Sequence, residues 1–379
     1  MGLLPKQNEQ KIGLILSGGG SRAAYQVGVL RAVANILPKG AANPFHIISG
    51  TSAGALNAVA IASHAHRFRT AVRTLELLWK NIDSSQIYTP YSGNLLTSAS
   101  SLVLSVFNGR KSDSVVALLN NKPLRQLLAR VIRFEKIQRN INLGHLDAIS
   151  VTASAYSTGE SISFFQSMEG IASWDGPHRI GVNTTLELDH LMASTAIPVV
   201  FPAVGIANQY FGDGAIRQIA PTSTAMHLGA RRILAVGVSA NSHKKPLEDE
   251  MTEQPSLLQI LGHIMNSAFV DTLENDLEFL RHINEIVPLV PAKLADEKKL
   301  LMSEVKLLEI SPSKELNVMA MEYYHELPKP MAKYIKEGSS GTLLSLILFE
   351  SGFCNALCEL GFQDAMEKET EIREFFLGQ

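Results

Sequence analysis

The sequence has few cysteines and no long apolar run. Its two cysteines, Cys354 and Cys358, stand one helical turn apart, a spacing that fits neither a CxxC motif nor a disulfide framework. A disulfide-stapled scaffold is therefore excluded, and a reducing compartment, the cytoplasm, is expected. The longest apolar candidate, Leu343 to Phe349, is far shorter than the roughly 20 residues that cross a bilayer. We expect any membrane contact to be peripheral.

The sequence also lacks an excess of charge of one sign. The 379 residues carry 34 Lys or Arg and 36 Asp or Glu, a net charge of −2 at pH 7, and they contain no block of basic residues. This argues against nucleic acid as a partner. The first residues lack the apolar stretch of a signal peptide, so we expect no export by that route. The hydrophobic content of 46% is that of a well-packed globular protein.

No Asp or Glu occurs between Glu9 and Glu76, and this gap excludes one reading of a glycine-rich turn. Gly18-x-Gly20-x-x-Ala23 follows an apolar strand and opens a helix, as in the dinucleotide-binding fingerprint. That fingerprint needs an acidic residue about 20 positions later for the ribose, and a phosphate-binding P-loop needs a Gly-Lys-Ser/Thr ending. Both are absent, and no acidic cluster has the spacing of a calcium loop. We expect no cofactor and no metal.

Short apolar runs that end in glycine turns alternate with amphipathic helices. This order is typical of a parallel sheet covered by helices. We predict an α/β fold with a parallel-rich central sheet sandwiched by helices, with a core at 12–240 and a mostly helical C-terminal part at 241–379. The predicted strands are 12–16, 45–48, 148–153, 161–165, 232–238 and 305–310, of which 148–153 and 161–165 form a hairpin at one end of the sheet; the predicted helices are 23–36, the helix after Ser52, 257–283, 314–336 and 342–368.

Ser52 stands in Gly50-Thr51-Ser52-Ala53-Gly54, directly after the second apolar run. A serine at a sharp strand-to-helix turn needs glycines beside it, because a Cβ there would collide with the neighbouring strand and helix. An α/β-hydrolase would add a histidine base behind its last strand. None of the candidates lies in a short glycine-bounded loop, and each reads as a surface or packed histidine: His227, His243, His263, His282 and His325.

A carboxylate is then left as the base. Asp213 lies between Gly212 and Gly214 at the edge of a strand, where it can approach another loop closely. The competing interpretation is a turn-forming Asp, which is the commonest use of Gly-Asp-Gly. A Ser52–Asp213 dyad is the economical hypothesis.

Three ordered motifs resemble the patatin-like phospholipase family: Ser17-Gly18-Gly19-Gly20-Ser21-Arg22, Gly50-Thr51-Ser52-Ala53-Gly54 and Asp213-Gly214-Ala215. The stretch Ala193–Pro198 is similar too, whereas Ala23 stands where many relatives carry Gly. The resemblance covers about 12–240 and implies a lipid acyl hydrolase with a Ser-Asp dyad and an acyl-enzyme. We then assign Ser52 as nucleophile, Asp213 as general base and acid, the backbone of Gly18, Gly19, Gly20 and Ser21 as the oxyanion hole, and Gly50, Gly54 and Gly214 as elbow and dyad glycines.

Two hypotheses are open for Arg22: its side chain contacts a substrate phosphate, or it braces the glycine-rich loop that precedes it. Two functional alternatives stay open, a catalytically idle lipid-binding scaffold and an acyltransferase or peptidase on the same dyad. Residues 84–115 are a candidate substrate-access flap. The apolar run from Leu343, with Phe353 and Leu357, could form a membrane interface or a homodimer contact, although burial in the core is the default.

Overall fold

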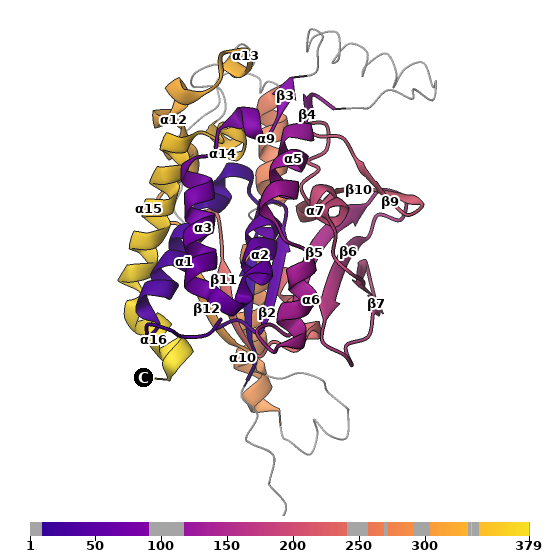
Figure 1. Cartoon of the computed structure of the whole chain (residues 1–379), viewed down its shortest axis with the longest axis vertical. Helices are drawn as coiled ribbons and strands as arrows, with labels where there is room; N and C mark the ends of the chain where they lie inside the picture. The colour runs from indigo at the N-terminus through magenta and orange to yellow at the C-terminus, as the bar shows by residue number, and fades with distance from the viewer. Residues whose placement is uncertain are drawn as a thin grey trace, which may run out of the picture.

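The computed structural model describes residues 10–90, 117–240, 257–268, 272–290, 304–332, 335 and 341–378. Within them, ten strands form one twisted sheet in the order β12-β11-β1-β2-β5-β6-β8-β7, with β10 and β9 joined to it through β5 (Figure 1). The strands are β1 (Ile12–Leu16), β2 (Ile47–Thr51), β5 (Ala148–Ala155), β6 (Ser161–Ser167), β7 (Trp174–Gly176), β8 (Arg179–Asn183), β9 (Val204–Ile206), β10 (Gln209–Asp213), β11 (Arg232–Val236) and β12 (Lys306–Ile310); β3 (Thr89–Pro90) and β4 (Leu119–Asn120) pair separately.

The strands β12, β11, β1, β2 and β5 are parallel. Those at the centre, β1, β2 and β5, are buried at every position because both faces of a parallel sheet are covered. Helices pack on the two faces and, at the upper end of Figure 1, beyond the sheet: α1 (Ala24–Ile36), α2 (Ala53–Ser63), α3 (Phe68–Lys80), α5 (Lys122–Val131), α6 (Glu135–Asn142), α7 (Leu188–Ser194), α8 (Pro221–His227), α9 (Leu257–Asn266), α10 (Thr272–Ile286), α12 (Leu316–Glu322), α13 (Lys329–Ala332), α14 (Gly341–Ile347), α15 (Ser351–Glu367) and α16 (Glu369–Leu377).

Alternate residues of β1 show the two layers. Leu14 and Leu16 join the larger core, which includes residues of α1, α2, α3 and α15, whereas Ile15 joins a second core with residues of α8 and α10. The helix α15, yellow in Figure 1, packs along α1. The predicted α/β class with a helix-covered, parallel-rich sheet is therefore confirmed.

The strand β5 explains how two distant segments meet. Its one edge is occupied by β6 along 148–154, and its other edge is shared between β2 and β10. Thr51, the last residue of β2, lies opposite Thr152, and Asp213, the last residue of β10, lies opposite Ala153. The two strands thus end at adjacent positions on one edge, which brings the residue after Thr51 next to Asp213.

Several details differ from the sequence prediction. The hairpin β5–β6 forms, but β8 and β7 extend the sheet beyond it, so it is not the end of the sheet. The predicted helix 257–283 is α9 and α10, with 269–271 outside the described residues. The candidate flap lies mostly outside them too, at 91–116. The run 343–349 is buried in the core, as are Phe353 and Leu357. No single helix in the described ranges is long and apolar enough to cross a membrane; α14 and α15 together would be, but they meet at 94°.

Candidate active site

Ser52 occupies the turn between β2 and α2 with φ 53° and ψ −130°. This backbone conformation is rare for a residue with a side chain, and such strain is typical of functional sites. The flanking glycines allow it sterically. A Cβ on Gly54 would lie 2.2 Å from the carbonyl oxygen of Leu16, and one on Gly50 would lie 2.7 Å from the Cβ of Ala58. The elbow therefore packs directly on the end of β1.

The hydroxyl of Ser52 donates a hydrogen bond to Oδ2 of Asp213 at 2.5 Å. Both side chains are buried, with 2% of Ser52 and none of Asp213 exposed. The other carboxylate oxygen, Oδ1, accepts from the backbone N–H of Ala215 at 3.0 Å. Gly214 is required beside it, since a Cβ there would lie 2.1 Å from the carbonyl oxygen of Thr152. The sequence motifs that carry the predicted dyad are thus in hydrogen-bond contact.

Burial raises the pKa of Asp213 to about 7, although the hydrogen bonds from Ser52 and from the Ala215 N–H oppose this shift. A carboxyl group with an ordinary pKa would be a weak base at neutral pH. Raised to about 7, the pKa matches the proton transfers that general acid–base catalysis requires near neutrality. Asp213 is therefore electrostatically suited to accept and return a proton.

Two further polar side chains, Ser194 and Gln218, hold the segments that carry the dyad. The sequence alone assigned them no role. Ser194 Oγ accepts the backbone N–H of Ser52 at 2.8 Å and donates to the carbonyl of Thr152 at 2.6 Å. Gln218 accepts from the hydroxyl of Thr51 and donates to the hydroxyl of Thr152. These contacts tie the elbow to β5 and to the segment after Asp213. A signal existed for Ser194, which lies in the quoted stretch Ala193–Pro198.

The glycine-rich loop from Gly18 to Ser21 follows β1 and is buried throughout. Gly20 has φ 56° and begins a short 3₁₀ helix, Gly20–Ala23. The first N–H groups of a helix have no acceptor within it and attract negative charge. Gly20 and Ser52 line the same pocket. The start of this short helix therefore lies at the pocket that contains Ser52, whereas Gly18, Gly19 and Ser21 are not among the residues that line it.

Asn57 connects this loop to the pocket wall. Its side-chain amide donates to the carbonyl of Ala23 at 3.0 Å and to Gln26 at 2.9 Å, while Trp79 donates to its oxygen at 2.8 Å. Gln26 in turn donates to the carbonyl of Ser17 at 2.8 Å. This buried chain of hydrogen bonds fixes the two ends of the loop against α2 and α3.

Arg22 does not line the pocket. Its side chain is buried and donates to oxygens of Ser345, Asn317 and Asn266, all in the C-terminal part of the chain. The structure thus separates Arg22 from Ser52 and supports the bracing hypothesis over contact with a substrate phosphate.

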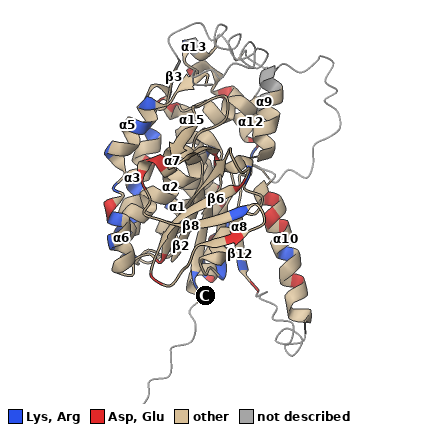
Figure 2. Cartoon of the chain, turned by 90° about the vertical axis from the view of Figure 1, so that its right-hand side faces the viewer, with Lys and Arg blue, Asp and Glu red and all other residues tan. Residues whose placement is uncertain are grey.

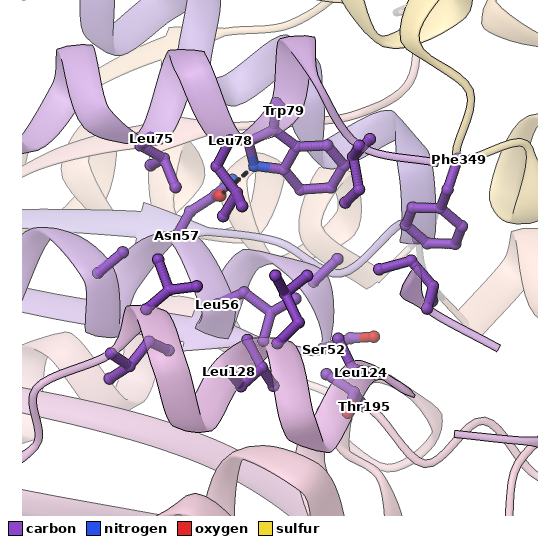
Figure 3. A pocket seen from close by; sticks show the side chains of 18 of the residues that line it. Ser52, Leu56, Asn57, Leu75, Leu78, Trp79, Leu124, Leu128, Thr195 and Phe349 are labelled. Carbon is purple, nitrogen blue, oxygen red and sulfur yellow. Dashed lines mark hydrogen bonds between the residues drawn. The ribbon is translucent and has the colours of Figure 1, made fainter. Parts of the chain in front are cut away.

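The pocket at Ser52 is apolar and has an empty volume of about 710 Å³, which includes space open to solvent (Figure 3). Leu56 and Ala60, one and two turns along α2 from the elbow, contribute from one side. The remaining lining comes mainly from α3 and α5, with Leu75, Leu78, Trp79, Leu124, Leu127, Leu128 and Val131.

No histidine of the described residues lines this pocket. His227 stacks on Trp174 with ring centroids 4.9 Å apart, and His263, His282 and His325 are exposed. His243 lies outside the described residues. Among the residues that the structure describes, no group of three or more His, Cys, Asp or Glu is placed to hold a metal ion.

Comparison with known proteins gives one family match. A family model described as patatin-like phospholipase matches residues 14–226, more than half of the chain. A curated relative, the cGAMP-activated phospholipase of Pseudomonas aeruginosa (strain BWHPSA011 / Pa011), is 28% identical over 215 residues, which are 56% of this chain and 55% of the relative. The matched region thus spans about half of that relative's length.

Two solved structures are also similar. VipD from Legionella pneumophila matches with a TM-score of 0.35 and 11% identity over 96% of this chain and 67% of that chain. Human GIVD cytosolic phospholipase A2, solved with methyl gamma-linolenyl fluorophosphonate and terbium chloride, matches with a TM-score of 0.45 and 11% identity over 98% of this chain and 60% of that chain.

Proposed function

Since the chain belongs to the patatin-like phospholipase family, we propose that it hydrolyses carboxylic esters of lipids through Ser52 and Asp213. One observation carries this proposal. The hydroxyl of Ser52, on a strained elbow, donates to a buried carboxylate with a pKa near 7 at the wall of an apolar pocket. A nucleophile, a base and an apolar binding site are the minimum that ester hydrolysis of a lipid requires.

In the first half of the reaction, Ser52 Oγ attacks the ester carbonyl carbon while its proton passes to Asp213 Oδ2. The carbonyl oxygen becomes an oxyanion, which the N–H groups of Gly19, Gly20 and Ser21 stabilise. Removal of one such donor costs roughly 2.7–4 kcal/mol in other hydrolases. The bond to the ester alcohol then breaks, and Asp213 gives the proton to the departing oxygen. An acyl group on Ser52 remains.

In the second half, water attacks the acyl carbonyl and Asp213 accepts a proton from that water. Collapse of the intermediate breaks the bond to Ser52 Oγ, which regains the proton from Asp213. The net change is one ester and one water converted into a fatty acid and an alcohol. The same carboxylate acts as base and then as acid, which a pKa of about 7 permits in both directions.

The pocket supports an acyl chain as the group that is bound. Figure 3 shows leucine side chains from α3 and α5 with Leu56 around the space beside Ser52. Apolar surface of this kind is stabilised by roughly 0.8 kcal/mol for each methylene group it buries. A charged or sugar-like substrate would gain nothing from such a wall. We therefore assign the acyl part of a lipid to this pocket.

Two helices that line the pocket, α3 and α5, and the next helix along the chain, α6, also fit an anionic lipid surface. Together α3, α5 and α6 carry eight Lys or Arg and two Glu, although the whole chain has a net charge of −2. Figure 2 shows the ribbon coloured blue at Lys and Arg positions along α5 and α6. Basic residues near an anionic membrane contribute roughly 1 kcal/mol each. We propose peripheral contact of this face with the lipid surface that supplies the substrate.

The test uses a fluorophosphonate that modifies active serines, followed by a panel of phospholipids, lysophospholipids and glycerides. The wild-type protein should form an adduct on Ser52 and release fatty acid, whereas Ser52→Ala should do neither. The assay is run with and without cGAMP, because the curated relative carries that activator in its name. A folded protein that forms no adduct under either condition would be a lipid-binding scaffold. Acyl transfer to an added alcohol in preference to water would make it an acyltransferase.

A further inference from the structure

Arg22, the residue after the oxyanion loop, is buried with 2% of its surface exposed. Its guanidinium reaches α14 and α12: Nε and Nη2 both donate to Ser345 Oγ, at 2.9 and 2.7 Å, and Nη2 also donates to Asn317 Oδ1 at 2.6 Å. A longer bond of 3.3 Å joins Nη1 to Asn266 at the end of α9. These helices pack on one another near the upper end of Figure 1.

The two loop residues before Arg22 contact the same helix. Ser21 Oγ donates to the carbonyl of Ser345 at 2.8 Å. Gly20 lies so close to α14 that a Cβ would be 1.9 Å from the carbonyl oxygen of Leu346. The last two residues of the loop and Arg22, which follows them, are therefore fixed by one turn of α14, which lies outside the region that matches the family.

Burial of the charged Arg22 side chain at this contact costs desolvation free energy. Burial lowers its pKa to about 10, and attraction from Glu315 opposes that shift only in part. The guanidinium stays charged at neutral pH, and its hydrogen bonds go to neutral serine and asparagine oxygens. Replacing a buried charge together with its partners by apolar side chains of similar size is often neutral or stabilising. What the guanidinium adds is direction, because its planar fork fixes several acceptors at once.

We propose that Arg22 is a positioning residue that holds the oxyanion loop in its catalytic conformation by clamping it to α14 and α12. The proposal rests on the proposed function. Through this clamp the backbone N–H groups of Gly19, Gly20 and Ser21 keep the place that the oxyanion requires.

The first test is Ser345→Ala, a small change that removes the oxygen shared by two guanidinium nitrogens. A misplacement of about 1 Å in catalytic geometry can lower a rate 100-fold, and we expect about 10-fold lower kcat here because Asn317 remains. KM for a soluble ester should stay within about twofold, since the acyl pocket is unchanged. The rate at which a fluorophosphonate modifies Ser52 should fall with kcat. Wild-type values of both rates would overturn the proposal.

The second test is Arg22→Met, with an expected loss of about 100-fold in kcat, and Arg22→Lys, which keeps the charge but not the fork and should recover only part of that loss. Arg31→Met is the matched control. Arg31 also joins α1 to the C-terminal part, through Glu359, and reaches Glu76 of α3, but it does not contact the loop. Its kcat should equal that of the wild type.

Stability and positioning are separated by the double variant Arg22→Met with Asn317→Leu. Asn317 is one of the acceptors that Arg22→Met leaves unpaired, and replacing it by an apolar group as well restores part of the stability that this costs. We expect Tm to recover while kcat stays low; recovery of kcat together with Tm would show a purely structural role. If the wild type neither hydrolyses esters nor reacts with the fluorophosphonate, the proposed function fails. If it does both and Ser345→Ala matches it, this proposal alone fails.

Discussion

The two halves of the candidate site are supported by different parts of the chain. The proposed nucleophile and the proposed base are held by Ser194, Gln218 and the N–H of Ala215, all within the region that matches the family. The oxyanion loop is held from outside that region, by Ser345 and Leu346 of α14 and by Asn317 of α12. The proton-transfer half is thus self-contained in the core, whereas the charge-stabilising half depends on the C-terminal part.

The largest expected effect comes from removing the base. Asp213→Asn keeps the shape and the buried position but cannot accept the proton, so kcat should fall by about 10²–10⁴-fold, the usual contribution of general acid–base catalysis. The hydrolysis of a soluble ester measures this. Asp276→Asn is the control: Asp276 is another aspartate whose pKa burial raises, bound to the N–H of Thr222 away from the pocket, and its variant should keep wild-type kcat.

The same variant should be more stable than the wild type in one pH range. The folded-state pKa of Asp213 is raised from 3.8 to about 7, so its ionisation destabilises the fold as pH rises from about 4 to 7, and this destabilisation is complete above 7. Asparagine cannot ionise. Thermal unfolding should therefore show a higher Tm for Asp213→Asn at pH 8 and a smaller difference at pH 5. Equal differences at both pH values would contradict a charged Asp213 at pH 8.

A change in the other half should leave the base untouched. Gly20→Ala places a methyl group against Leu346 and forces a positive φ on alanine, which displaces the loop from α14. We expect about 10²-fold lower kcat, the lower end of what one lost oxyanion donor costs. Gly40→Ala is the matched control, because Gly40 also has positive φ but no neighbour within 4 Å of its Cβ position. If both variants lose the same activity, backbone strain alone explains the effect.

The contrast between the halves also explains what could be predicted from the sequence. The strand-to-helix turn at Ser52 and the Gly-Asp-Gly turn are local patterns, so their residue types identified them. Their meeting depends on the register of β10 on β5, which follows from tertiary pairing and leaves no local trace. Arg22 was ambiguous for a similar reason. Its partners lie more than 240 residues away in the sequence, so neither burial nor direction could be read from its neighbours.

The pocket serves both halves, and a change at its far side should affect neither. Ala60→Phe would fill the space two turns along α2 from Ser52 while leaving the dyad and the loop in place. Each methylene group excluded from the pocket costs roughly 0.8 kcal/mol, so the loss of two would lower the preference for long over short acyl chains about 10-fold. Competing esters of different chain length measure this ratio. The rate of reaction with a small fluorophosphonate should not change.

Ser194 tests the self-contained half with a milder perturbation. Ser194→Ala leaves the backbone N–H of Ser52 and the carbonyl of Thr152 without their partner, which relaxes the strained elbow. Loss of a buried hydrogen-bond partner costs about 1–3 kcal/mol, and we expect several-fold to 10-fold lower kcat together with a lower Tm. Ser223→Ala is the control, because the hydroxyl of Ser223 hydrogen-bonds to the exposed His227. A full retention of kcat would show that the elbow holds its conformation without Ser194.

The smallest expected effect is the pH dependence of kcat/KM. It is the most diagnostic, because the two halves of the site should differ in the midpoint of the pH profile and not only in the size of the rate loss. Asp213 must be ionised to accept the proton from Ser52, so kcat/KM should rise with pH and reach half of its plateau near pH 7. The rate should therefore only double between pH 7 and the plateau.

The variants of the two halves should differ in the midpoint of this pH profile. Gly20→Ala and Arg22→Met lower the plateau but leave the environment of Asp213 intact, so their midpoints should stay near 7. Ser194→Ala changes the elbow that donates to Asp213, and weakening of that hydrogen bond should raise the pKa of Asp213 and the midpoint with it. A midpoint that moved with the oxyanion loop variants and not with Ser194→Ala would show that the two halves are coupled, contrary to the separate supports that the contacts indicate.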